Sequence, residues 1–160
     1  MDNAERDVLD LYGGKDAVLE RMGEEFKRGL LTKIGEIQRE CSKPYSEEEV
    51  LKLISKKLSL RPGILEGILN GTKQVDYNLF DGLEFSFDLS INRVLGKPSL
   101  PCSNEEKQYW LDEPKRVPMS NMPPGMDNFN RYWLYFNLSA ISRLRKLSDT
   151  NYKTPLKKAG

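Results

Sequence analysis

Residues 58–71, "LSLRPGILEGILNG", decide how the middle of this 160-residue chain folds. The apolar residues of the stretch are Leu58, Leu60, Ile64, Leu65, Ile68 and Leu69. After Pro62 they recur at steps of three and four, which is typical of a short amphipathic helix. The stretch closes on Asn70 and Gly71, where glycine can adopt the left-handed conformation that ends a helix. The pattern therefore predicts a turn at Ser59 and Leu60, followed by a short helix.

A second helix is expected immediately before that turn. Ser46 and Glu49 have the S-x-x-E spacing of a capping box, in which each side chain accepts a hydrogen bond from the other residue's backbone. The apolar residues Val50, Leu51, Leu53, Ile54 and Leu58 then give a buried face as far as Lys57 or Leu58. In the helix that follows the turn, Pro62 suits the first position, which puts Arg61 at the cap.

Further helices are expected on both sides of this pair. Residues 2–11 predict a short helix, and residues 15–41 show an amphipathic pattern interrupted by three glycines. Those glycines favour either a break near Gly23 or a helix held mainly by packing, with residues 26–40 as its most secure part. Residues 76–87, 89–95 and 127–147 predict three more helices. The core candidates of the first of these three are Tyr77, Leu79, Phe80, Leu83 and Phe87.

The sequence divides into four parts. Residues 1–96 form a helical domain, and the prolines between 98 and 124 indicate an irregular connector over residues 97–126. A C-terminal amphipathic helix occupies residues 127–150, and a flexible basic tail occupies residues 151–160. The fold class is therefore all-α.

Composition excludes several classes of protein. The chain has 25 basic and 24 acidic residues, so any cationic surface must be local. It has no histidine, which removes the commonest general base and zinc ligand. Because no nucleophile motif or glycine-rich phosphate loop is present either, we expect no enzyme, no cofactor and no metal.

Compartment is inferred from the absence of export and membrane signals. No apolar run approaches the roughly 18 residues of a membrane span, and the first residues are acidic where a signal peptide is basic. We therefore expect a soluble, cytoplasmic protein. Cys41 and Cys102 are interpreted as reduced thiols, with a disulfide between them as the alternative.

The block "EEEVLKLISKKLSLRPGILEGILNGTKQVDYNLFDGLEFSFDLS" resembles the helix-turn-helix of Cro and lambda-repressor-like (Xre-type) proteins, and the likeness covers residues 26–95. In that pattern a leucine ends the scanning helix, and a glycine thirteen residues later closes the recognition helix, as Leu58 and Gly71 do here. The resemblance implies that Leu60 plugs the turn. It also implies inward positions for Leu65 and Ile68. Two departures are Ser59, where glycine is common, and Leu51, where a phosphate-contacting glutamine is frequent.

The resemblance implies that residues 46–71 bind DNA. The outer face of the recognition helix reads Arg61, Pro62, Gly63, Glu66, Gly67 and Asn70. Of these, Arg61 and Asn70 are of the types that hydrogen-bond base edges. Lysines and polar residues around the two helices suit phosphate oxygens. The predicted DNA-binding residues are Lys52, Lys56, Lys57, Arg61, Gly63, Asn70, Thr72, Lys73 and Gln74.

The sequence thus predicts a DNA-binding transcription regulator, such as a repressor, or a nucleoid-type protein that acts on double-stranded DNA as a homodimer. Phe129, Trp133, Phe136 and Leu144 follow a helical stripe and are the candidates for a dimer interface. The alternative is a protein-interaction module, antitoxin-like or phage-encoded, that docks the same fold on another protein. Near-zero net charge, Glu66 and the glycines of the recognition helix favour that alternative.

Overall fold

The computed structural model describes residues 7–42, 44–96, 128–148 and 152, with backbone alone for residues 128–135. The described residues are mostly helical and contain no strand, so the all-α class is confirmed at that level. The elements are η2 (Val8–Tyr12), α1 (Lys15–Glu40), α2 (Glu47–Lys57), α3 (Ile64–Asn70), α4 (Tyr77–Gly82), α5 (Ile91–Leu95) and α7 (Asn128–Leu147). The predicted connector, residues 97–126, lies outside the described residues.

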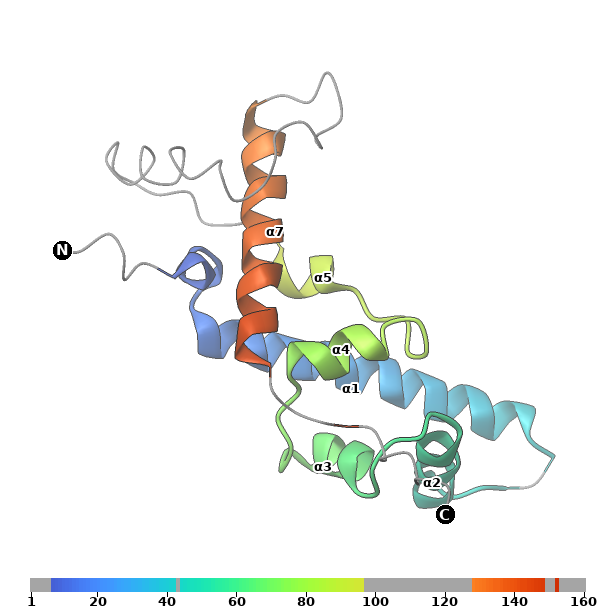
Figure 1. Ribbon diagram of the computed structural model, residues 1–160. Coiled ribbons are helices and arrows are strands. Elements are labelled where there is room, and N and C mark those ends of the chain that lie inside the picture. Colours follow the sequence, from blue (N-terminus) through green and yellow to red (C-terminus); the bar gives the residue numbers. More distant parts are fainter. Residues whose placement is uncertain (1–6, 43, 97–127, 149–151, 153–160) are drawn as a thin grey trace, which may run out of the picture. The chain divides into compact units, whose positions relative to one another are not determined.

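The chain divides into two compact units, each built from two separate stretches of sequence. Unit 1 comprises Met1–Arg21 and Ile91–Leu147, and unit 2 comprises Met22–Ser90 and Ser148–Gly160. Figure 1 labels the α-helices. The helix α1 supplies its first residues to unit 1 and the remainder to unit 2. Unit 1 therefore joins segments that the sequence-based division assigned to different parts.

Unit 1 begins with a single tight helical turn. Asp7 caps η2 by accepting a hydrogen bond from the backbone N–H of Leu9 at 3.0 Å, and Gly13 ends the turn at φ 95°. The guanidinium of Arg21 donates to the carbonyls of Tyr12 and Val94, each at 2.7 Å. One side chain therefore holds η2, α1 and α5 together. Of the helix predicted over residues 2–11, residues 2–6 lie outside the described residues, and the described part is a 3₁₀ turn.

The C-terminal helix α7 packs on η2. Tyr12 donates a hydrogen bond to the amide oxygen of Asn137, and burial raises the pKa of the Tyr12 phenol. Arg143 pairs with Asp7 at 3.0 Å. Two side chains of α7 that the sequence assigned to a dimer interface are buried within the chain.

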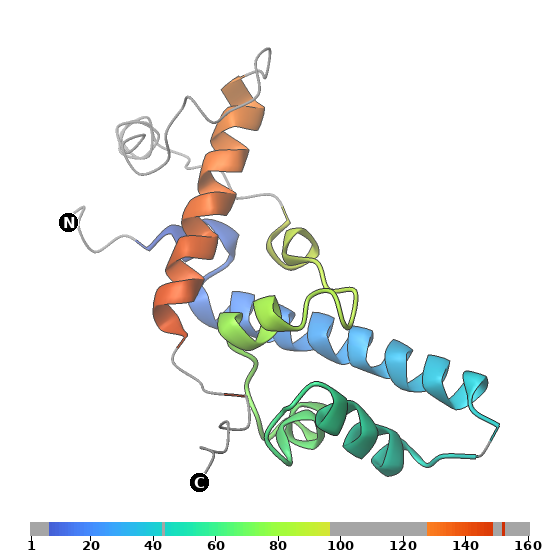
Figure 2. The ribbon, with the colours of Figure 1, turned by 45° about the vertical axis from the view of Figure 1, so that its right-hand side comes forward.

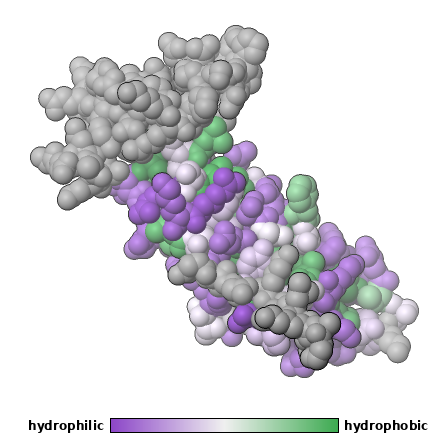
Figure 3. Space-filling model, viewed as in Figure 1, coloured by the Kyte–Doolittle hydropathy of each residue, from purple (hydrophilic) through white to green (hydrophobic). Residues whose placement is uncertain are grey.

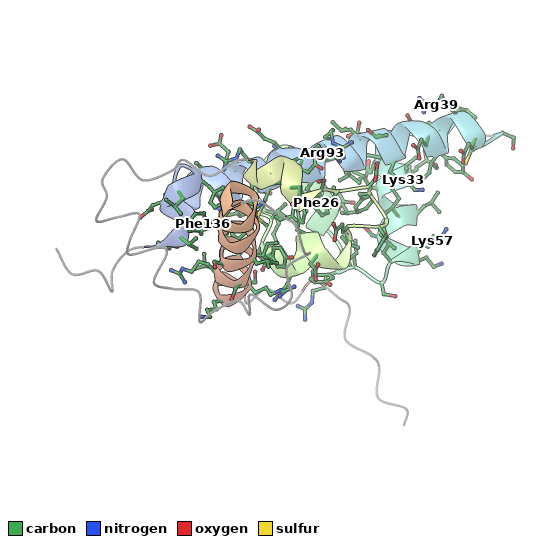
Figure 4. All side chains as sticks on the ribbon, turned by 90° about the horizontal axis from the view of Figure 1, so that it is seen from above. Phe26, Lys33, Arg39, Lys57, Arg93 and Phe136 are labelled. Carbon is green, nitrogen blue, oxygen red and sulfur yellow. The ribbon has the colours of Figure 1, made fainter. Side chains whose placement is uncertain are left out.

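Two of those four candidates require correction. Phe136, labelled in Figure 4, and Leu144 are 3% and 1% exposed, so they belong to the core of the single chain. A helical apolar stripe serves a core as well as an interface, and here the chain itself supplies the partner surface. Phe129 and Trp133 have side chains outside the described residues.

In unit 2, α1 runs without interruption through its glycines. No break occurs at Gly23, so the prediction of a helix held by packing is the correct alternative. Phe26 is fully buried and meets Phe87 edge to face, with ring centroids 5.4 Å apart. Figure 4 shows Phe26 on the inner side of α1. Figures 1 and 2 show α2 beside the C-terminal half of α1.

A buried carboxylate fixes the end of the first stretch of unit 2, and no pattern in the sequence predicts it. Glu25 is 8% exposed, pairs with Arg28 at 2.8 Å and accepts the N–H of Ser90 at 2.8 Å. Arg28 in turn donates to the carbonyl of Asp88 at 2.7 Å. Because α4 ends at Gly82, the predicted helix 76–87 is too long. Turns occupy residues 83–88, and Asp88 among them has a φ of 51°.

The core candidates of this region are correct, since Tyr77, Leu79, Phe80, Leu83 and Phe87 are all buried. Cys41 is half-buried just after α1, and Cys102 lies outside the described residues. On the face drawn in Figure 3 the described surface is mainly hydrophilic, with separate apolar patches.

Candidate nucleic-acid interface

The helix α2 is capped as the sequence predicts. The Ser46 hydroxyl accepts the N–H of Glu49 at 3.2 Å, and a Glu49 carboxylate oxygen accepts the N–H of Ser46 at 3.3 Å. Val50, Leu51 and Ile54 form the buried face of the helix. Leu51 is only 4% exposed, so packing explains this residue where the helix-turn-helix pattern often has glutamine.

The cations of α2 lie away from its buried face. Lys52, Lys56 and Lys57 are exposed, and Figure 4 shows Lys57 pointing outward at the end of the helix. Lys52 lies 3.4 Å from Glu48, with both side chains more than two-thirds exposed. Water screens such an ion pair strongly, so Lys52 keeps most of its capacity to meet another anion.

A sharp corner, residues 58–63, joins α2 to α3. The N–H of Ser59 donates to the carbonyl of Lys56 at 3.2 Å, and the N–H of Leu60 donates to the carbonyl of Ser55 at 2.9 Å. These two bonds are the 5→2 and 6→1 pair of a Schellman motif. Helix α2 therefore ends at a geometrically defined stop, and the chain leaves in a new direction.

Two residues fix the direction of the corner. Ser59 has a φ of 56°, in the left-handed region that glycine prefers and where glycine is common in the family pattern. Leu60 is 4% exposed, as expected for the plug of the turn. Leu65 and Ile68 of α3 are also buried, at 0% and 1% exposure, as predicted. The packing of α3 on α2 follows from these apolar contacts.

The start of α3 differs from the prediction. The helix begins at Ile64 and Gly63 occupies the cap position at φ 84°, so Pro62 and Arg61 belong to the corner. Proline was expected at the first helical position because its fixed φ suits it. A left-handed Gly63 redirects the chain two residues later, which a sequence pattern does not reveal. The end of α3 is as predicted, with Gly71 at φ 83°.

Gly67 is not on the outer face of α3. Its carbonyl accepts the N–H groups of Thr72 and Lys73 at 2.9 and 3.0 Å, which folds these residues back over the helix. A Cβ at Gly67 would lie 3.0 Å from the Cβ of Lys73. The predicted outer position is therefore buried, because the segment after the helix covers it.

The polar atoms of Asn70 and Thr72 are directed toward each other. The amide oxygen of Asn70 accepts the N–H of Thr72 at 2.9 Å and its hydroxyl at 2.6 Å. Asn70 retains its NH₂ donors, so it can meet an acceptor more readily than a donor. Glu66 is half-buried, and one of its carboxylate oxygens accepts no hydrogen bond within the described residues.

All nine predicted DNA-binding residues lie within one short part of unit 2. Eight are exposed and Lys73 is half-buried. Their cations are Lys52, Lys56, Lys57, Arg61 and Lys73. Only Glu66 opposes them between residues 52 and 73, and it is half-buried, as Lys73 is. The segment therefore presents a local excess of positive charge.

One partner of this region was missed. The backbone N–H of Arg61 donates to the carbonyl of Tyr152 at 3.0 Å, which brings the C-terminal segment to the corner. The contact joins residues far apart in the chain, and neither residue type carries a signal for it.

Comparisons with protein families, with curated proteins and with solved structures found no match to this chain. None of the helices formed by the described residues has the length and apolar character needed to cross a bilayer. The same residues contain no group of three or more side chains suited to hold a metal ion.

Proposed function

We propose that the chain is a helix-turn-helix protein that binds double-stranded DNA through α2, the corner and α3, as a transcription regulator or nucleoid-type protein. The observation that carries the proposal is the corner itself. A left-handed Ser59 and a buried Leu60 join two short helices, as in the family pattern. The exposed cations on either side of the corner suit the phosphates of a duplex.

The types of the exposed side chains indicate which residues contact phosphates and which contact bases. Lys56, Lys57 and Lys73 bind phosphates, and Arg61 meets a base edge, since arginine donates in a fork that fits guanine. Asn70 offers its amide donors alone, because Thr72 engages its oxygen. One copy therefore carries few base-reading groups. We propose that two copies bind together, so that their contacts add over two half-sites.

The test is duplex binding measured by fluorescence anisotropy over a range of salt. In each copy the three phosphate-binding lysines give a slope of log K against log salt of about −2.7, or roughly 40-fold weaker binding between 50 and 200 mM salt. The variant K56E/K57E should lose binding at low salt. The control K15E/K146E makes the same charge change at two exposed residues outside α2 and α3. A flat salt response, or equal losses in both variants, contradicts the proposal.

The proposed homodimer is tested by a separate measurement of the mass of the complex. Light scattering of the chain mixed with a duplex should give the mass of two chains per duplex. A mass of one chain per duplex at saturation contradicts the two-copy proposal and leaves the DNA-binding proposal unaffected.

A second candidate, a protein-interaction module, is favoured by one specific observation. Phe85 is 98% exposed in the turns after α4, with exposed Asp81 and Asp88 nearby in the sequence. An aromatic side chain left wholly in water suits a hot spot of a protein interface. If K56E/K57E leaves DNA binding unchanged, capture of a protein partner that F85A abolishes becomes the better explanation.

A further inference from the structure

The exposed ring of Phe85 lies between carboxylates. In the turns after α4, the N–H of Glu84 donates to the carbonyl of Asp81 at 3.5 Å, and the N–H of Phe87 donates to that of Leu83 at 3.1 Å. The chain therefore continues in helical turns, in which residues three and four apart lie on one side. Asp81 precedes Glu84 by three residues and Phe85 by four. We call Asp81, Glu84 and Phe85 the acidic turn.

The sequence around the acidic turn carries no positive charge. Residues 74–92 contain four acidic residues and neither lysine nor arginine. Arg28 of α1 donates to the carbonyl of Asp88 at 2.7 Å, and Glu25 pairs with it at 2.8 Å, which offsets its charge. The acidic turn therefore presents an aromatic ring, 98% exposed, within negative charge.

The outer side of α2 has the opposite arrangement. Leu53 is 47% exposed, and Lys56 and Lys57 follow it by three and four residues in the same helix. We call these three residues the basic face. The acidic residues of α2, 47–49, lie in its first turn. Phosphate contacts use cations and hydrogen-bond donors, so DNA binding leaves an exposed leucine in this position unexplained.

The acidic turn and the basic face are complementary. Each has one exposed apolar side chain beside two like charges, and the two pairs of charges have opposite sign. An apolar centre with a polar rim is the usual anatomy of a protein interface, and opposite charges steer such surfaces together. Both surfaces belong to unit 2, so every copy carries both. At 98% exposure, Phe85 has no such contact within its own chain.

We propose that the acidic turn of one copy docks on the basic face of a second copy, with Phe85 against Leu53 and the carboxylates beside the lysine ammonium groups. This self-contact does not require DNA. It covers Lys56 and Lys57, which the proposed function assigns to phosphates, so a copy whose basic face is occupied withholds it from a duplex. That consequence alone rests on the proposed function.

The first experiment exchanges the charges and contains no DNA. Sedimentation velocity of the full chain at low salt should show association that increases with concentration and that high salt weakens. D81K/E84K and K56E/K57E each oppose like charges, so each variant alone should remain a single chain. Mixed in equal amounts, the two variants restore opposite charges at both contacts, native in one and reversed in the other, and should associate.

Recovery on mixing also shows that both charge variants are folded. The control K15E/K146E changes two exposed residues outside the two surfaces and should associate as the unaltered chain does. The self-contact is overturned by a mixture that stays dissociated, by charge variants that associate alone, or by an equal loss in the control. An unaltered chain that remains single at every concentration overturns the second copy as the occupant.

The second experiment tests the apolar centre. Phe85→Ala removes a ring that makes almost no contact within the chain, so it should leave the fold intact, as circular dichroism checks. It should weaken self-association roughly tenfold or more, as truncation of an interface hot spot does. The control Leu138→Ala changes another exposed apolar residue, on α7, and should leave association unaltered. Equal association of Phe85→Ala and the unaltered chain overturns the self-contact.

Failure of the self-contact is distinguishable from failure of the proposed function. If mixing restores no association while the chain binds duplex with the expected salt slope, the self-contact alone is refuted. If mixing restores association but the chain binds no duplex at low salt, the proposed function alone is refuted. Where both hold, added duplex should separate the associated copies, because it binds the same two lysines.

Discussion

Replacing Gly29 by alanine should destabilise unit 2, although alanine is the better helix former. In a helix interior, Gly→Ala stabilises by about 0.8–1.0 kcal/mol. A Cβ at Gly29 would overlap the backbone carbonyl oxygen of Phe87 and lie 2.7 Å from a methyl carbon of Leu89. Overpacking of this kind costs about 1–3 kcal/mol, and the upper end applies because a backbone atom cannot rotate away. The net loss is about 2 kcal/mol.

Gly23 provides the matched control in the same helix. A Cβ there meets nothing within 4 Å, so Gly23→Ala should raise stability by up to about 1 kcal/mol. For a chain of this size, thermal denaturation followed by circular dichroism should lower Tm by roughly 4–8 °C for Gly29→Ala and raise it by about 2–4 °C for Gly23→Ala. Equal Tm changes, or a rise for Gly29→Ala, would refute the close packing of α1 against Phe87.

Three further substitutions test the local geometry by urea denaturation. Ser59→Gly relieves a left-handed serine, so stability should rise by about 0.5–1 kcal/mol; a fall would contradict the conformation of the corner. Ser46→Ala removes the cap of α2 and should cost about 1 kcal/mol, and a loss below a few tenths would argue against the capping box. Glu25→Ala removes the partner of Arg28 and an acceptor for the N–H of Ser90, so stability should fall by about 2–3 kcal/mol, and a neutral effect would contradict that buried network.

The sequence predicted those features that local patterns determine. The capping box at Ser46, the helix stop at Gly71 and the burial of Leu60 each follow from residue types a few positions apart. The all-α class follows from the apolar spacing. The nine candidate DNA-binding residues were also found to be close in one part of unit 2, with Lys73 alone half-buried.

The remainder depends on contacts between residues far apart in the sequence. Glycine is needed at position 29 of α1 because the backbone carbonyl of Phe87 occupies the space that a Cβ would take. The low helix propensity of glycine therefore does not indicate a helix break at this position. Gly67 is buried because Thr72 and Lys73 fold back over it. The start of α3 shifted because Gly63 adopts a positive φ. No local pattern encodes any of these three contacts or conformations.

Unit 2 is discontinuous in the sequence, and this determines when its contacts can form during translation. The chain leaves this unit after Ser90 and returns at Ser148. On the ribosome, the Ser148 acceptor for the first N–H groups of α4 and the Tyr152 acceptor for Arg61 are synthesised only after α7. Domains generally fold as units during translation. A nascent chain that stops before Ser148 therefore holds every residue of α2 and α3 but lacks the acceptors that Ser148 gives to the start of α4 and that Tyr152 gives to Arg61.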